Sequence, residues 1–259
     1  MKNLYRGRVA LVTGGTQGLG ESVARALARE GAAGLTVVGR DVDRGKRVAA
    51  ELTASGCDAL FLRADLRDAD EATTVVPAAI ERFGRLDGLV NAAGSTARGT
   101  LEETTAAMFD DMMAVNVRAP LLLMQGAVRD MLTRGEGGAI VNVLSMSAHG
   151  GQPHLAAYSA SKAALGALTK NVAHAHRFDR IRVNGLNLGW TDTPNEHVVQ
   201  RKVHGRPADW LEQVRDVLPM GRLADPDEVA DLVALLLSDR GGVMTGSLID
   251  YHQDVVGAG

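Results

Sequence analysis

The sequence holds one cysteine, no block of like charges and no long apolar run. A single cysteine excludes an internal disulfide and a zinc site built from cysteines. Cys57 follows a Ser-Gly turn and precedes a strand-like run, which is typical of a structural thiol rather than a nucleophile.

Basic and acidic residues are interspersed, and the net charge is −3. This balance gives no long-range attraction for nucleic acid or for an anionic membrane. The longest apolar stretches, such as residues 232–237, are far too short to cross a bilayer. Residues 1–8 are polar and lack the apolar core of a secretion signal. We therefore expect a cytoplasmic protein with no nucleic-acid and no membrane partner.

Short apolar runs alternate with longer helical patterns along the chain. The expected strands cover residues 9–13, 35–38, 59–62, 86–90, 139–143, 181–184 and 247–249, and the clearest helices cover residues 21–29, 42–54 and 68–83. Apolar strands that alternate with helices predict an α/β fold, with a doubly wound parallel sheet of about seven strands covered on both faces. No linker, composition break or repeat divides the chain, so we predict a single domain over residues 1–259.

Residues 190–221 interrupt this alternation just after the sixth expected strand. The segment is rich in proline, histidine and charged residues. Ligands bind at the carboxyl ends of the strands in an open α/β sheet. We therefore expect a substrate lid at about residues 190–221.

A glycine cluster joins the first expected strand to the first helix. Glycines at this place let the backbone turn sharply and present helix N-terminal amides to a pyrophosphate. The spacing is not Gly-x-Gly-x-x-Gly, and no Gly-Lys-Ser/Thr follows, so the loop is not that of an NTPase. The expected nucleotide contacts are Thr13, Gly14, Thr16, Gln17, Gly18, Leu19 and Gly20.

Tyr158 and Lys162 lie four residues apart in a stretch that predicts a helix, which places both on one helical face. A free phenol titrates at about pH 10, and a nearby cation favours the phenolate. The pair is a candidate acid and base. By itself the spacing is weak evidence, because it also occurs by chance in surface helices.

Further motifs give the pair its weight. The Thr-Gly-x-x-x-Gly-x-Gly pattern at residues 13–20, together with residues 158–162, resembles the short-chain dehydrogenase/reductase family over essentially the whole chain. Residues 91–94 are similar to the family's Asn-Asn-Ala-Gly motif, with alanine for the second asparagine. Asn116 matches its helix asparagine, and Ser145 its catalytic serine. The resemblance implies a Rossmann-type fold and hydride transfer between a nicotinamide cofactor and an alcohol or carbonyl.

The resemblance also implies roles for four catalytic residues. Tyr158 would exchange a proton with the substrate oxygen, and Lys162 would lower the pKa of the phenol. Ser145 would hydrogen-bond the substrate oxygen, and Asn116 would hold a water that links Lys162 to solvent. Ser147 is near the same strand end, but its eleven-residue spacing to Tyr158 disfavours it.

Cofactor choice depends on the end of the second expected strand. Gly39 stands where NAD-selective relatives carry aspartate, and the following Arg40 would attract a 2′-phosphate, which favours NADP(H) over NAD(H). Asp41 leaves NAD(H) open, since it could pair with Arg40 or approach the ribose itself. The resemblance implies further cofactor contacts from Asp65, Leu66, Asn91, Ala92, Gly94, Tyr158, Lys162, Gly189, Thr191 and Thr193.

Substrate contacts are expected from His149, His154, Asn187 and Trp190, together with the polar and partly basic lid. These residues favour a small polar alcohol or carbonyl substrate, such as a sugar, a polyol or a hydroxy acid. Alternatively, the lid charges only solvate its outer face. A 3-oxoacyl-thioester reductase and a non-catalytic nucleotide-sensing regulator are the alternative functions. No histidine pair has metal-ligand spacing with a carboxylate, so no metal site is expected.

Two segments also suggest how copies of the chain assemble. Residues 114–131 and 157–175 carry small and apolar side chains on several helical faces. The family usually forms tetramers through such helices, so the resemblance implies a homotetramer. The alternative is that these faces simply pack on the sheet.

Overall fold

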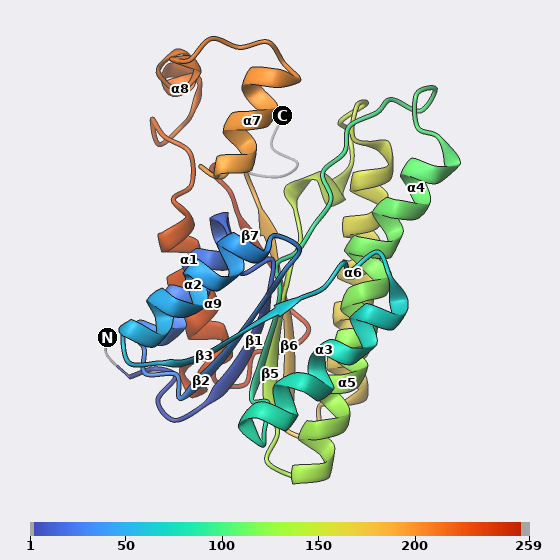
Figure 1. Ribbon diagram of the computed structural model, residues 1–259. Helices are drawn as coiled ribbons and strands as arrows, with labels where there is room; N and C mark the ends of the chain where they lie inside the picture. The colour runs from blue at the N-terminus through green and yellow to red at the C-terminus, as the bar shows by residue number, and fades with distance from the viewer. Residues whose placement is uncertain (1–2, 255–259) are drawn as a thin grey trace.

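A single parallel sheet organises the molecule in the computed structural model, which describes residues 3–254 (Figure 1). Its strands are β1 (Val9–Thr13), β2 (Gly34–Gly39), β3 (Asp58–Arg63), β4 (Gly88–Asn91), β5 (Gly138–Val143), β6 (Ile181–Leu188) and β7 (Leu248–Tyr251). They lie in the order β3-β2-β1-β4-β5-β6-β7, and every neighbouring pair is parallel. The predicted doubly wound sheet is confirmed.

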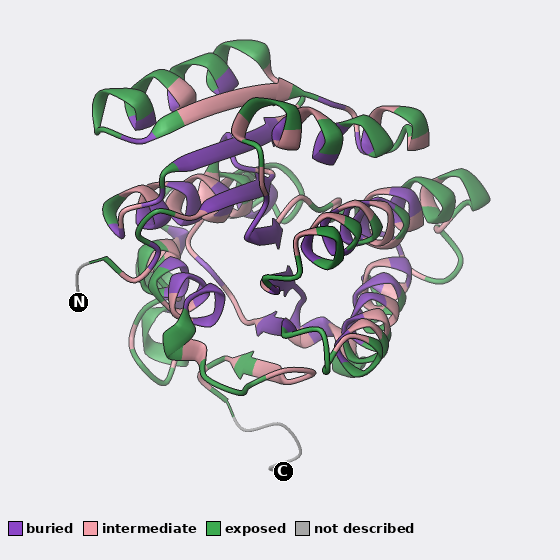
Figure 2. Ribbon diagram, turned by 90° about the horizontal axis from the view of Figure 1, so that it is seen from below, coloured by how far each residue is buried: buried purple, intermediate pink, exposed green. Residues whose placement is uncertain are grey.

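Helices cover both faces of this sheet (Figure 1). On one face lie α1 (Gly18–Arg29), α2 (Val42–Ala54) and α9 (Pro226–Leu237); on the other lie α3 (Ala69–Phe83), α5 (Ala119–Arg134) and α6 (Ala156–Ala175). Each face has its own apolar core, so the inner strands are buried on both sides, whereas the edge strands β3 and β7 are partly exposed (Figure 2). All five residues of β1 are buried, which explains why this strand reads as a continuous apolar run.

The observed strands differ from the predicted ones mainly at their ends. β6 continues to Leu188, four residues beyond the prediction, because Gly185 to Leu188 pair with β7. β4 begins at Gly88 rather than at residue 86. The Leu86 N–H instead donates to the Asp130 carboxylate, outside the ladder.

The structure also bears on the single cysteine, on membrane spans and on metal sites. Cys57 is buried, and burial raises the pKa of its thiol to about 11, as suits a structural thiol. Between residues 3 and 254, no helix is long and apolar enough to cross a bilayer. Within the same range, no group of three or more His, Cys, Asp or Glu side chains could hold a metal ion.

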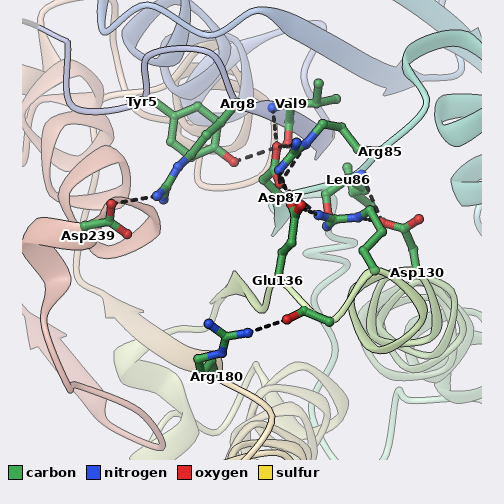
Figure 3. A network of polar contacts seen from close by, with 12 residues as sticks. Tyr5, Arg8, Val9, Arg85, Leu86, Asp87, Asp130, Glu136, Arg180 and Asp239 are labelled. Atoms are coloured by element: carbon green, nitrogen blue, oxygen red, sulfur yellow. Dashed lines mark hydrogen bonds and ion pairs between the residues drawn. The ribbon is translucent and has the colours of Figure 1, made fainter.

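Charged residues join the amino ends of β1 and β4 (Figure 3). The buried Asp87 carboxylate accepts the Val9 N–H at 2.9 Å and three hydrogen bonds from the Arg85 guanidinium. Arg134 lies 3.4 Å from the same carboxylate. The Tyr5 hydroxyl donates to the Val9 carbonyl at 3.2 Å, and burial followed by the Asp87 charge raises the pKa of this phenol. The network fixes the strand ends that lie opposite the carboxyl edge.

We expect Asp87→Ala to lower the free energy of unfolding by about 2–3 kcal/mol, because one buried amide and two guanidinium groups lose their shared acceptor. Urea unfolding followed by circular dichroism measures the change. The control is Asp231→Ala, which removes an exposed ion pair with Arg29 and should cost less than about 0.5 kcal/mol. Equal effects of the two variants would contradict a role for Asp87 in stability.

Candidate active site

A cleft of about 1610 Å³ opens at the carboxyl edge of the sheet. It lies where the strand order reverses, between β1 and β4, which is the usual ligand position in an open α/β sheet. Sites for single drug-sized ligands occupy roughly 300–1,000 Å³. The cleft therefore has room for a dinucleotide and a second small molecule.

The glycine loop forms one wall of this cleft. Helix α1 begins at Gly18, and no side chain caps the free amides of its first turn. Gly14 has a φ of +66°, and a side chain there would come within 2.9 Å of the Ala93 backbone nitrogen. Gly18 has a φ of +52°, also in the left-handed region that favours glycine. The uncapped helix start and the bare backbone beside it fit a pyrophosphate.

Two of the residues expected to contact the cofactor lie beneath the cleft instead of lining it. The buried Thr13 hydroxyl accepts the N–H groups of Ala92 and Ala93, each at 3.1 Å. The Asn91 amide donates to the Asn142 side chain at 2.8 Å. Both residues hold the backbone that forms the cleft wall. The other expected contacts do line the cleft: Gly14, Thr16, Gln17, Gly18, Leu19, Gly20, Arg40, Asp65, Leu66, Ala92, Gly94, Tyr158, Lys162, Gly189, Thr191 and Thr193.

Arginines and carboxylates surround the end of the cleft near β2 and β3. Asp65 pairs with Arg67 at 2.6 Å, and this hydrogen-bonded partner lowers the pKa of the Asp65 carboxyl to about 2. Asp41 caps α2 and pairs with Arg44 at 2.9 Å, and its pKa is lowered chiefly by the Arg44 backbone N–H. Arg40 has no hydrogen-bonding or ion-pair partner among residues 3–254. Asp41 and Asp65 thus each have an arginine partner, whereas the Arg40 guanidinium has no carboxylate partner among the described residues.

Ser145, Tyr158 and Lys162 meet at the inner end of the cleft. Ser145 follows β5 and begins a short 3-10 helix (Met146–His149), where its hydroxyl accepts the Ser147 N–H at 3.1 Å. The Ser145 side chain is also close enough to the Tyr158 phenol to lower its pKa. Lys162, one turn after Tyr158, donates to the Val143 carbonyl at 2.7 Å. The serine at the expected thirteen-residue spacing is therefore the one that reaches the phenol.

The pKa values of this group differ from the sequence-based expectation. Burial raises the pKa of Tyr158 and outweighs the lowering by Ser145. The Lys162 ammonium lies 5.7 Å from the centre of the Tyr158 ring and is turned toward Val143, so the expected lowering of the phenol pKa by Lys162 is not seen. Burial lowers the pKa of Lys162 to about 8. The phenol is protonated at neutral pH and can donate its proton.

Asn116 does not line the cleft. It lies in a π-helical turn (Ala114–Arg118) between α4 (Ala106–Met113) and α5. Its amide donates to the Ser95 carbonyl at 2.9 Å and to the Ser161 hydroxyl at 3.0 Å, and its oxygen accepts the Ser95 N–H at 2.8 Å. The side chain thus ties the cleft-lining loop after β4 to α6.

The four expected substrate residues separate into two pairs. His154 and Trp190 line the cleft, whereas His149 and Asn187 do not. Asn187 donates to the Asp250 carboxylate at 2.7 Å, and His149 lies 3.4 Å from the same carboxylate. Asn187 and Asp250 are register partners on β6 and β7, which explains why the amide turns away from the cleft.

Several cleft residues carried no recognisable signal in the sequence. Arg44 and Arg67 follow the ends of β2 and β3, and Arg98 lies four residues after Gly94. Glu196 also faces the cleft from the predicted lid. The available signal was position alone, because each residue closely follows the carboxyl end of a strand.

A family model described as short chain dehydrogenase matches residues 8–204. The chain belongs to the short-chain dehydrogenase/reductase family. It is 38% identical over 249 residues to an uncharacterised oxidoreductase of Thermotoga maritima, covering 95% of this chain and 96% of that protein. It is 36% identical over 250 residues to cis-4-hydroxycyclohexanecarboxylate dehydrogenase of Sinomonas cyclohexanicum, with 96% of each chain covered. The crystal structure of L-sorbose reductase from Gluconobacter frateurii, complexed with NADPH and L-sorbose, matches with a TM-score of 0.93 at 30% identity, covering 100% of both chains.

In this short-chain dehydrogenase/reductase, the predicted lid has a small apolar core of its own. The lid contains α7 (Pro194–Lys202) and α8 (Trp210–Val214), which lie beyond the carboxyl edge of the sheet (Figure 1). Trp210 is fully buried and stacks on Trp190 with ring centres 5.6 Å apart. The Trp190 indole N–H donates to Glu196 at 2.7 Å. Opening and closing of this segment stays a prediction.

The lowered pKa of Lys162 makes stability depend on pH. The ammonium titrates at about pH 8 in the folded chain and at about 10.4 when unfolded. Between these values the unfolded chain binds more protons, so the Lys162 contribution to stability rises with pH. Relative to Lys162→Met, the wild-type free energy of unfolding should rise by up to about 3 kcal/mol over this range.

Urea unfolding at a series of pH values measures this difference. Lys170→Met is the control, since Lys170 is exposed on the same helix and should give a difference that does not vary with pH. A pH-independent difference for Lys162→Met as well would show that the buried ammonium is not perturbed.

Proposed function

We propose that this protein is an NADP(H)-dependent alcohol dehydrogenase or carbonyl reductase for a small polar substrate. The observation that carries the proposal is the placement of Ser145 beside Tyr158 in the cleft wall, with buried Lys162 one helical turn away. A nucleotide-sensing regulator would have no use for such a proton-transfer pair. The relatives named as a dehydrogenase and as a reductase support the same reaction class.

When bound, the nicotinamide would supply or accept the hydride. Tyr158 then donates its proton to the carbonyl oxygen in reduction and takes it back in oxidation. Ser145 stabilises the negative charge that develops on the same oxygen. Lys162 lies one helical turn from the phenol, and its pKa of about 8 keeps it mostly charged at neutral pH. The uncapped start of α1 and the glycine loop would hold the pyrophosphate.

The preference for NADP(H) is supported by the residues at the end of β2. A side chain at Gly39 would meet the Thr16 hydroxyl at 2.6 Å, so the aspartate of NAD-selective relatives would require Thr16 to shift. Arg40 lines the cleft without an ion-pair partner among the described residues. Asp41 and Asp65 are each neutralised by an arginine. This end of the cleft therefore favours a cofactor that carries the 2′-phosphate of NADP(H).

A polar substrate is supported by the cleft wall and by the relatives. His154, Trp190, Gln200 and Arg206 all line the cleft beside the catalytic pair. The relatives' names specify a hydroxycyclohexanecarboxylate in one case and L-sorbose in the other. Both compounds carry oxygen atoms in addition to the reacting one, as expected for a sugar, polyol or hydroxy acid.

A homotetramer and a cytoplasmic location remain further proposals for this protein. Helices α4 and α5 follow one another in a continuous helical run, and α6 lies beside it on one face of the molecule (Figure 1). Phe109 and Leu132 are exposed on that face. These apolar groups would suit contact with another copy of the chain.

Replacing the phenol tests the proton-transfer step. Tyr158→Phe should lower kcat by about 10²–10⁴-fold, because it removes the hydroxyl that exchanges a proton with the substrate oxygen. The affinity for NADPH, measured by its fluorescence, should stay within about threefold. Near-normal kcat in this variant would refute the mechanism.

The two neighbouring serines provide a matched pair within the same experiment. Ser145→Ala should lower kcat by about 10²–10³-fold, as expected for loss of one donor to a developing oxyanion. Ser147→Ala should leave kcat nearly unchanged, since only its backbone contacts Ser145. The reverse ranking would assign catalysis to Ser147.

Arg40→Ala tests cofactor selection. Losing a charged hydrogen bond of about 1.5–3 kcal/mol should weaken NADPH binding by about 10- to 150-fold. NADH binding should change by less than about threefold, because NADH lacks the 2′-phosphate. Lys46→Ala, an exposed change on α2, is the control for general electrostatic effects. Equal losses for NADPH and NADH would contradict a phosphate contact at Arg40.

A further inference from the structure

Arg98 is a half-buried cation in the wall of the cleft. It lies in the loop after β4, four residues beyond Gly94. Its Nε atom is buried and has no hydrogen-bond partner among residues 3–254. No part of the hydride-transfer chemistry described above uses this guanidinium.

The charge of Arg98 acts on the catalytic group and on the lid together. It lowers the pKa of Tyr158, after the larger effects of burial and Ser145. It also lowers the pKa of His204, although burial makes the larger contribution to that lowering. Arg98, Tyr158 and His204 thus line the same cleft, with Arg98 near enough to both groups for its charge to act on them.

The groups around Arg98 supply little compensating negative charge. Of the described carboxylates, Glu196 is the one whose charge acts on both Tyr158 and His204. One Glu196 oxygen already accepts hydrogen bonds from Trp190 at 2.7 Å and from Gln200 at 2.5 Å.

More positive charge comes from the lid side of the cleft. The Arg206 guanidinium lies 5.7 Å from the centre of the Trp190 ring, which gives it a cation–π contact but no counter-charge. His154 and His204 meet edge to face at 6.1 Å. Because the pKa of His204 is lowered, its ring is neutral at neutral pH and adds a hydrogen-bonding group rather than a charge.

A partly buried cation without a partner is costly, since it loses hydration and gains no ion pair. An anion that enters the cleft removes this cost and gains a charge-assisted hydrogen bond. A guanidinium presents a planar set of donors that matches the two oxygens of a carboxylate. The unpartnered Nε atom of Arg98 is one such donor.

We propose that the substrate is a hydroxy acid or the corresponding oxo acid, with its carboxylate bound by Arg98. The proposal rests on the hydride-transfer function given above and specifies its substrate class. The reacting hydroxyl or carbonyl would meet Ser145 and Tyr158 at the other end of the same molecule. Arg98 is then a specificity-determining residue that leaves the proton-transfer step unchanged.

The experiment compares hydroxy and oxo acids with their uncharged amides and with neutral polyols, by NADPH and NADH absorbance. For the wild type, kcat/KM should be about 10- to 150-fold higher for an acid than for its amide, as one charged hydrogen bond predicts. Arg98→Met should raise KM for the acid by a similar factor and leave kcat nearly unchanged. The amide should be turned over equally well by both proteins.

Arg201→Met is the matched control, because Arg201 is an exposed lid arginine that does not line the cleft. It should leave KM for the acid unchanged. NADPH binding to each variant reports correct folding, and Arg98→Gln replaces Arg98→Met if that variant loses NADPH. Calorimetric titration of the enzyme–NADP complex with the acid gives a second measure, which should show tighter binding to the wild type than to the variant.

The outcomes separate this proposal from the proposed function. If polyols are turned over better than acids, and Arg98→Met changes KM for none of them, the carboxylate site is refuted while hydride transfer stands. A preference for phosphate or sulfonate esters over carboxylates refutes it in the same way. If the enzyme reduces or oxidises none of these compounds with either cofactor, the proposed function itself fails.

Discussion

The contact between the Lys162 ammonium and the Val143 carbonyl, 2.7 Å long, joins helix α6 to the end of β5. Ser145 follows Val143 by two residues, and Tyr158 precedes Lys162 by one helical turn, so this single hydrogen bond sets the positions of both. Burial removes hydration from the Lys162 ammonium, and this loss lowers its pKa to about 8. The packing of α6 on the apolar core keeps the ammonium in this buried position.

The cleft has a charge pattern that the whole chain does not share. The net charge is −3, yet Arg40 at one end of the cleft and Arg98 at the other lack partners among the described residues. About half of the arginines outside the cleft pair with carboxylates, as Arg29 does with Asp231 and Arg85 with Asp87. The net charge of the chain therefore gives little information about the charge of the ligand, whereas the unpaired arginines within the cleft give more.

The sequence allowed prediction of whatever depends on local spacing. The alternation of apolar runs and helices predicted the sheet, and the intervals between the glycine loop, Ser145 and Tyr158 predicted which residues meet. Residues whose environment depends on distant partners were less accessible. Asn187 turns to Asp250 because β6 and β7 align in one register, and Asn116 is held by Ser95 from another loop. The pKa of Tyr158 depends on burial, which no interval reveals. Arg98 in an irregular loop resembles any surface arginine until the fold surrounds it.

The close approach of Gly39 to Thr16 has a consequence for how this cleft could evolve. Any side chain added at Gly39 would collide with the Thr16 hydroxyl at 2.6 Å and its methyl group at 2.7 Å. A larger residue at position 39 therefore requires the Thr16 side chain to move or to be replaced. The two positions are thus coupled, and substitutions at residues 16 and 39 are expected to be non-additive.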